Sequence, residues 1–200
     1  MKTFIALVLL LVSGLVMTQG SAIPGQNIET LLSTQTSSAY LGPSFGINNP
    51  AGIIGLKADF RLGDRWLLGG GAGIGGWGWK LSGTAQFFLK PDMRGFAIGS
   101  GLSYASGLSN DLTVTEENSN GLNQTIFVTA KPSVTALLTG AHYFKMGRRN
   151  RFFLQYGLSL PLNDRYDAHS TQPISEASKI VLGIMAPGGI IFGFGFLFGL

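Results

Sequence analysis

The chain ends on the stretch Ile190-Ile191-Phe192-Gly193-Phe194-Gly195-Phe196-Leu197-Phe198-Gly199-Leu200. From Phe192 onward a large apolar side chain occupies every second position, and three of the four positions between them are glycine. Successive side chains of a β-strand point to opposite faces. The pattern therefore predicts a strand with one face of large apolar groups and one almost bare face. Such a strand suits a bilayer, where one face meets hydrocarbon and the other a crowded barrel interior.

A transmembrane helix is the alternative for this end of the chain. Residues 180–200 contain no charged side chain, and that length is enough for a helical span. However, Pro187-Gly188-Gly189 interrupts the segment, and phenylalanines at a period of two do not form one face of a helix. The period favours the strand.

Alternation of the same kind recurs from Tyr40 onward. In the clearest case, Ile53–Leu62, five apolar residues alternate with Lys57, Asp59 and Arg61. Trp66 and Trp77 stand at the two ends of another segment, where aromatic girdles of a membrane barrel would lie. With the last strand, the predicted strands are Tyr40–Asn48, Ile53–Leu62, Trp66–Trp77, Trp79–Leu89, Phe96–Tyr104, Ser133–Phe144 and Phe152–Leu162. We therefore predict an all-β fold, an eight-stranded antiparallel up-and-down transmembrane β-barrel.

The connections between these strands differ in length on the two sides of the predicted barrel. Residues 63–65, 90–94 and 145–150 form short turns on one side, which we assign to the periplasm. The long loops, 106–124 and 163–187, fall on the other side, together with the connections at 48–52 and 77–79. The first long loop has room for strand extensions at Leu112–Thr115 and Thr125–Thr129, and the second for a short helix within Ile174–Met185.

The N-terminus has the features of a secretory signal. Lys2 precedes a short apolar core, and Gly20-Ser21-Ala22 offers small residues for cleavage. We expect a signal peptide at 1–22, a polar periplasmic tail at 23–37 and the barrel at 38–200. Losing Lys2 takes the formal charge from +4 to +3, which does not suggest a nucleic-acid partner. Only 12% of the residues are charged, 30 of 200 are glycine and none is cysteine, a composition that suits a membrane barrel and excludes disulfides.

Four charged residues are expected inside the barrel: Lys57, Asp59, Arg61 and Lys80. A buried charge must be paired. Asp59 bridging the cations would plug the interior, since eight strands leave room only for side chains. A narrow pore that prefers anions is the alternative, and the plug is favoured.

Chemical motifs are weak in this chain. The G-x-G-x-x-G match at 71–76 is followed by another predicted strand, whereas a dinucleotide site needs a helix. The G-x-S-x-G match at 42–46 lacks the strand-turn-helix of a nucleophile elbow. The two histidines are His142 in a strand and His169 in the last loop, and a lone loop histidine is usually solvated. We expect no catalytic residue, no cofactor and no metal ligand.

The chain resembles the small eight-stranded outer-membrane barrel proteins, and most of all the outer membrane β-barrel family common in Bacteroidota. The resemblance covers residues 38–200 and is most specific at Pro187-Gly188-Gly189-Ile190-Ile191-Phe192-Gly193. Gly195, Phe198 and Leu200 are similar to the terminal signal that the barrel assembly machinery reads. The chain departs from that signal in ending on leucine rather than an aromatic residue, and in having Gly193 where a polar residue is usual.

The resemblance implies insertion into the bacterial outer membrane with a structural or surface-interaction role and no catalysis. Expected partners are outer-membrane lipid and the assembly machinery, and loops 106–124 and 163–187 are the candidate sites for an extracellular partner. Three alternatives remain open: a lipid-modifying enzyme on the same barrel, a narrow pore, and a soluble secreted barrel that binds an apolar ligand. The last would require the phenylalanine face of the final strand to point inward.

Overall fold

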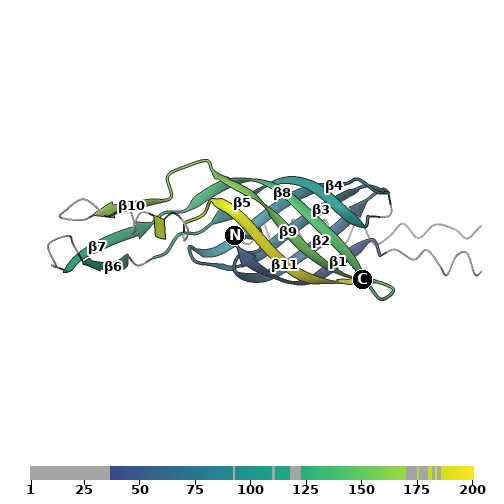
Figure 1. Ribbon diagram of the computed structural model, residues 1–200, viewed down its shortest axis with the longest axis horizontal. Helices are drawn as coiled ribbons and strands as arrows, with labels where there is room; N and C mark the ends of the chain where they lie inside the picture. The colour runs from purple at the N-terminus through teal and green to yellow at the C-terminus, as the bar shows by residue number, and fades with distance from the viewer. Residues whose placement is uncertain are drawn as a thin grey trace, which may run out of the picture. The chain divides into compact units, whose positions relative to one another are not determined.

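The computed structural model describes residues 37–91, 93–109, 111–117, 123–169, 175, 180, 181, 183 and 186–200. Its secondary structure is built from strands, apart from helical residues at 180, 181 and 183 within the segment where a short helix was expected (Figure 1). Eight of them form the barrel: β1 (Ala39–Ile47), β2 (Ile54–Leu62), β3 (Trp66–Gly75), β4 (Gly78–Phe88), β5 (Gly95–Ala105), β8 (Ser133–Met146), β9 (Asn150–Pro161) and β11 (Gly189–Gly199). Three further strands form a second sheet: β6 (Leu112–Glu117), β7 (Asn123–Ala130) and β10 (Tyr166–His169).

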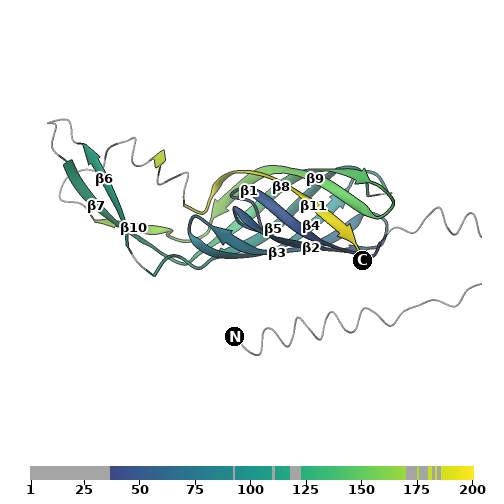
Figure 2. The same ribbon diagram turned by 90° about the horizontal axis from the view of Figure 1, so that it is seen from below.

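The barrel is closed and antiparallel throughout. Its strands follow one another in the order β1-β11-β9-β8-β5-β4-β3-β2, and the ring closes where β1 pairs with β2 on one side and β11 on the other. Figure 2 shows β11, in yellow, among the barrel strands. The prediction of eight antiparallel strands is confirmed. Closure leaves no unpaired edge on the barrel, so every strand finds partners for its backbone groups on both sides.

Alternating side chains separate the two faces of the barrel wall as the sequence predicts. In β11, Phe192, Phe194, Phe196 and Phe198 are exposed on the outside, while the residues between them face inward. The inward face is bare because close packing requires it: a Cβ added to Gly195 would lie 2.7 Å from a ring carbon of Phe153. The phenylalanine face therefore points away from the interior, contrary to what a soluble ligand-binding barrel would need.

Charged side chains follow the same separation. All of the charged residues in the eight barrel strands lie at inward positions: Lys57, Asp59, Arg61, Lys80, Lys145 and Arg151. The outward positions are mostly large apolar residues or glycine and alanine. The barrel therefore has an uncharged outer wall.

Two predicted boundaries need correction. Trp77 is not the end of an outward-facing strand, because the β3–β4 ladder ends at the pair Gly75–Gly78 and Gly76-Trp77 forms the turn. Its ring is buried, and the outward tryptophan at this end of the barrel is Trp79. The basic turn predicted at 145–150 is shorter, because β8 continues to Met146 and pairs it with Asn150.

The second sheet is made by the two long connections. The β5–β8 connection supplies β6 and β7, which extends the two predicted short strands into a hairpin, and the β9–β11 connection supplies β10, which we did not predict. We call the barrel end from which both connections leave the loop end, and the opposite end the turn end. β6, β7 and β10 lie together apart from the barrel strands (Figure 2). Trp77 joins the two parts, since its indole N–H donates to the Arg165 carbonyl O at 3.1 Å and its ring packs with Ile126 and Val128.

Some predictions fall outside the described residues. They are the signal peptide at 1–22, nearly all of the tail at 23–37, and most of the helix predicted within 174–185. Within the described part of the chain, no helix has the length and apolar character needed to cross a membrane.

Candidate functional site in the barrel interior

The turn end of the interior is filled by apolar side chains. Nine buried residues from seven strands and one turn make up this apolar plug: Tyr40, Leu67, Phe88, Met93, Ala97, Ala141, Tyr143, Phe153 and Leu197. Met93 reaches it from the turn before β5, where its backbone has a φ of 52°. Protein interiors pack at crystal-like density. A plug of this kind blocks passage through the turn end.

An ion pair lies against this plug. Lys57 Nζ is 2.6 Å from Asp59 Oδ2, and the two side chains are 3% and 0% exposed. Lys57 also donates to the Tyr143 hydroxyl at 2.8 Å, and that hydroxyl donates to Gln86 Oε1 at 2.6 Å. The ammonium lies 4.7 Å from the centre of the Phe153 ring, close enough for a cation–π contact. The ammonium is therefore compensated by both charge and hydrogen bonds, whereas Asp59 Oδ1 is buried without a hydrogen-bond partner among the described protein atoms.

The other two expected cations do not reach Asp59. Arg61 lies near the turn end and pairs with Asp64 at 3.1 Å. Lys80 lies near the start of β4, toward the loop end, and donates to the Asn48 carbonyl O at 3.2 Å. Strand direction accounts for the separation. β2 runs toward the turn end and has Arg61 near its last residue, whereas β4 starts at the loop end and has Lys80 near its first residue.

A fifth charge, Arg151, also belongs to the interior. It directly follows the turn predicted at 145–150, but it is only 7% exposed and its guanidinium lies 4.2 Å from the centre of the Tyr40 ring. The alternation of side chains along β9 already indicates that Arg151 points inward. Phe152 and Leu154 point outward, so Arg151 and Phe153 must point inward.

The loop-end half of the interior is polar. Ser103 and Thr135 share a hydrogen bond of 2.7 Å across β5 and β8. Several buried polar atoms of this region have no hydrogen-bond partner among the described protein atoms: those of Ser82, Ser133, Thr139, Gln155 and Ser159. Buried polar groups without protein partners are commonly satisfied by internal water. The loop-end half is thus lined by hydroxyl and amide groups, whereas the turn-end half combines the apolar plug with the buried polar residues Lys57, Asp59, Gln86 and Arg151.

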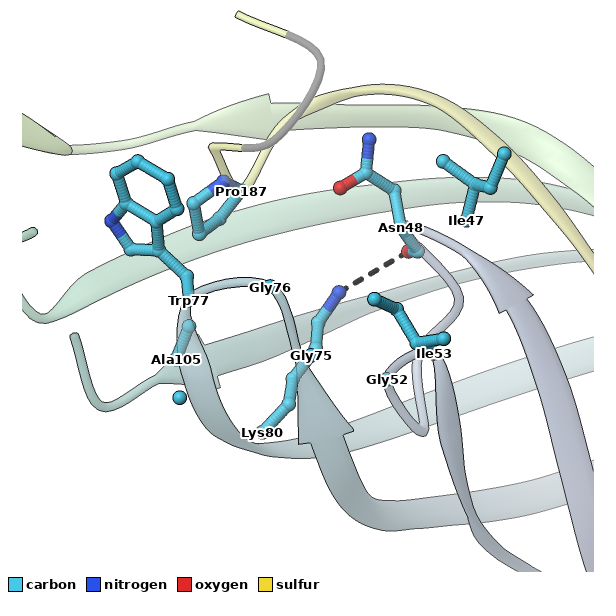
Figure 3. Close-up of a pocket in the computed structure, with 11 residues that line it drawn as sticks. Ile47, Asn48, Gly52, Ile53, Gly75, Gly76, Trp77, Lys80, Ala105 and Pro187 are labelled. Carbon is cyan, nitrogen blue, oxygen red and sulfur yellow. Dashed lines mark hydrogen bonds between the residues drawn. The ribbon is translucent and has the colours of Figure 1, made fainter. Parts of the chain in front are cut away.

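A cavity of about 240 Å³ opens at the loop end of this polar region. The β1–β2 turn, the β3–β4 turn and Pro187 surround it, and Lys80 reaches across it (Figure 3). Its lining combines the buried residues Trp77, Lys80 and Ala105 with Ile47 at the end of β1 and Ile53 in the β1–β2 turn, which are both more than half exposed. The cavity therefore joins the barrel interior to the apolar outer wall.

The motif matches lie in strands, as we expected. Ser44 is buried within β1 and accepts a hydrogen bond from Asn49 Nδ2 at 2.6 Å, so it is not on a strand-to-helix turn. Residues 71–76 run along β3 into a turn that leads to β4, with no helix after them.

The two histidines occupy different parts of the fold. His142 lies on the outer wall with its ring near those of Phe96 and Tyr156, and its Nδ1 is 3.3 Å from the Tyr156 hydroxyl. His169 ends β10, and the placement of its side chain lies outside what the structure describes. Within the described residues, no three His, Asp or Glu side chains are grouped as metal ligands would be.

The three residues predicted as an assembly signal lie at the end of β11. Gly195 faces inward against Phe153, Phe198 faces outward, and Leu200 donates its backbone N–H to Ala39 O at 3.0 Å. That last hydrogen bond belongs to the seam where the end of the chain closes the barrel against β1.

No protein-family model matches the chain, and no curated protein matches it in sequence. The barrel and its interior are therefore the features from which a function can be inferred.

Proposed function

We propose that this protein is an integral outer-membrane β-barrel with a sealed interior, which carries a structured loop region for surface interaction and has no catalytic role. The observation that carries the proposal is the uncharged apolar wall. Large apolar residues are exposed on each of the eight strands: Leu41, Leu56, Leu68, Leu81, Leu102, Leu138, Leu158 and Phe194.

A wall of this kind is costly in water. Soluble monomers rarely expose contiguous apolar patches larger than a few hundred Å², whereas here the patch runs round the barrel. A hydrocarbon environment removes the cost, and it also explains why every charged residue of the barrel strands lies at an inward position.

Aromatic pairs on the outer wall mark two levels along the strands. Trp79 and Tyr104 lie 5.2 Å apart near the loop end, and Trp66 and Phe87 lie 5.2 Å apart near the turn end. Eight residues of β4 separate the two levels, which corresponds to about 20 Å for a strand tilted by about 40°. That height is close to the apolar band of about 25 Å in outer-membrane barrels.

The apolar plug and the Lys57–Asp59 pair favour a sealed barrel over a narrow pore. Nine buried side chains fill the turn end, and the ion pair lies directly against them. An open cavity at the loop end alone does not provide a path for ions.

The loops supply the proposed interaction surface. The β6–β7–β10 sheet is anchored on Trp77, which is 2% exposed. Anchoring lowers the entropy that a partner would otherwise have to remove on binding. We therefore propose outer-membrane lipid and the barrel assembly machinery as partners of the barrel, and an extracellular partner for this sheet.

Two measurements test the membrane proposal. The chain, expressed in a Gram-negative host, should fractionate with outer membranes, resist carbonate extraction and migrate faster on a gel before boiling than after it. Planar-bilayer recordings should show no stable conductance. Recovery as a buffer-soluble protein would overturn the membrane role, and a stable conductance would overturn the sealed interior.

A further inference from the structure

Lys80 is a buried cation without a counter-charge in the described structure. It is 5% exposed, and none of the ion pairs among the described residues includes it. Its Nζ donates to one carbonyl O, that of Asn48, at 3.2 Å. A lysine ammonium has three donors. A buried charge that is not paired is costly, so an anion beside this ammonium would be strongly favoured.

The cavity around Lys80 has the shape and lining of a small amphiphile site. It measures about 240 Å³, and apart from Lys80 and Asn48 its lining is glycine, alanine, proline, isoleucine and tryptophan. The side-chain amide of Asn48 is already engaged, because it donates to the Gly188 carbonyl O at 2.5 Å. Lys80 is therefore the group that would select a ligand's charge.

The direction of an attached apolar chain follows from the surroundings. Inward from the cavity, the wall is lined by hydroxyl groups such as those of Ser82, Ser103 and Thr135, where an acyl chain would be unfavourable. Outward from it, Ile47 and Ile53 are exposed beside the apolar wall. The site thus favours a charged head at Lys80 and a tail that leaves over these two isoleucines.

From this arrangement we infer that the cavity is a binding site for a single-chain fatty acid, with its carboxylate on Lys80 and its acyl chain on the outer wall. A carboxylate fits better than a phosphate monoester. The site offers one cation and two remaining ammonium donors, whereas a phosphate carries more charge and usually recruits several cationic or backbone donors. The cavity also lies below the range of about 300–1,000 Å³ typical of sites that enclose a whole drug-sized ligand, so most of the tail remains outside.

The position of the tryptophans provides the experiment. Trp77 lines the cavity, while Trp66 lies at the turn end. Two single-tryptophan variants, one that keeps Trp77 and one that keeps Trp66, are folded in a nonionic detergent and titrated with 2-bromohexadecanoic acid or its methyl ester. Bromine quenches indole fluorescence on close approach, and the chain has no cysteine for the probe to alkylate.

We expect the acid to quench Trp77 at a concentration about ten-fold or more below the ester, because hydrogen bonds to a charged group are the stronger kind. Trp66 should respond equally to both probes. Lys80→Met should abolish the difference at Trp77, and Lys80→Arg should keep it. Gly75→Val should also abolish it with Lys80 in place, since a Cβ there lines the cavity and its nearest neighbour is 3.8 Å away.

If the acid and the ester quench Trp77 equally in the protein that keeps Lys80, the inference is overturned. This outcome does not depend on the behaviour of the Lys80 or Gly75 variants. Competition by lysophosphatidate that is stronger than competition by hexadecanoate would overturn the carboxylate assignment. The gel shift before boiling verifies folding of each protein. The assay is done in detergent, so its result is independent of whether fractionation supports the membrane proposal.

Discussion

The Lys57–Asp59 pair offers the sharpest test of how the interior is held together. Lys57→Met removes the ammonium 2.6 Å from Asp59 Oδ2 and leaves the carboxylate buried. Among the described residues, the hydrogen-bond partner left to the Asp59 side chain is the Tyr143 hydroxyl at 3.4 Å, a long contact that compensates poorly. Removing one partner of a buried ion pair costs about 3–5 kcal/mol, so we expect a loss of that size in the free energy of unfolding.

The double variant Lys57→Met/Asp59→Asn separates the pair from its individual residues. It buries no charge, and replacing both members of a buried pair is often nearly neutral. We expect its unfolding free energy to lie within about 2 kcal/mol of the parent protein, so that the two single substitutions are strongly non-additive.

The assay is urea unfolding of the protein in phospholipid vesicles, followed by tryptophan fluorescence and by the gel shift before boiling. Arg61→Met is the matched control on the same strand. Its partner Asp64 is 82% exposed, and pairs of this kind are worth under about 1 kcal/mol. A Lys57→Met effect no larger than that of Arg61→Met, or additive single substitutions, would refute the reasoning.

Three further predictions concern the wall and its loop region. Gly195→Leu should abolish the fast-migrating unboiled band, because a Cβ at this position would lie 2.7 Å from a ring carbon of Phe153. Leu138→Arg, on the outer wall midway along β8, should lower stability in vesicles by about 2–4 kcal/mol in urea titrations, whereas Leu162→Arg beyond the end of β9 should cost about 0–1 kcal/mol. Trp77→Ala should expose the second sheet to limited proteolysis while the barrel keeps its gel shift, since the ring is packed against that sheet.

Each control substitutes the same residue type at a site where the proposed contact is absent. Gly83→Ala has no neighbouring atom within 4 Å of the added carbon and should keep the fast band. Trp79→Ala removes a half-exposed tryptophan of the outer wall and should leave proteolysis of the second sheet unchanged. Equal stability of the two arginine variants would contradict the membrane interpretation of the wall.

The number of strands and the direction of their side chains, inward or outward, could be predicted from the sequence because both depend on patterns between neighbouring residues. The period of two in Ile53–Leu62 and in the final eleven residues already separates the inward from the outward side chains, and the structure confirms that separation. The same period of two, extended back from Phe152 to the turn predicted at 145–150, also places Arg151 inside the barrel. Trp77 shows where the rule fails, since the ladder stops at Gly75 and the packing of a distant sheet decides where the ring lies.

By itself, therefore, the sequence determined an eight-stranded barrel with charges on the inside. Only the tertiary structure decided which of these charges meet. Lys57 contacts Tyr143, which is 86 positions away, and Asp59 pairs with Lys57, while Lys80 lies nearer the loop end and contacts Asn48. The physical reason is that closure of the barrel and the stagger of its strands set the height of each side chain in the interior. A repeating pattern along one strand carries no information about that height.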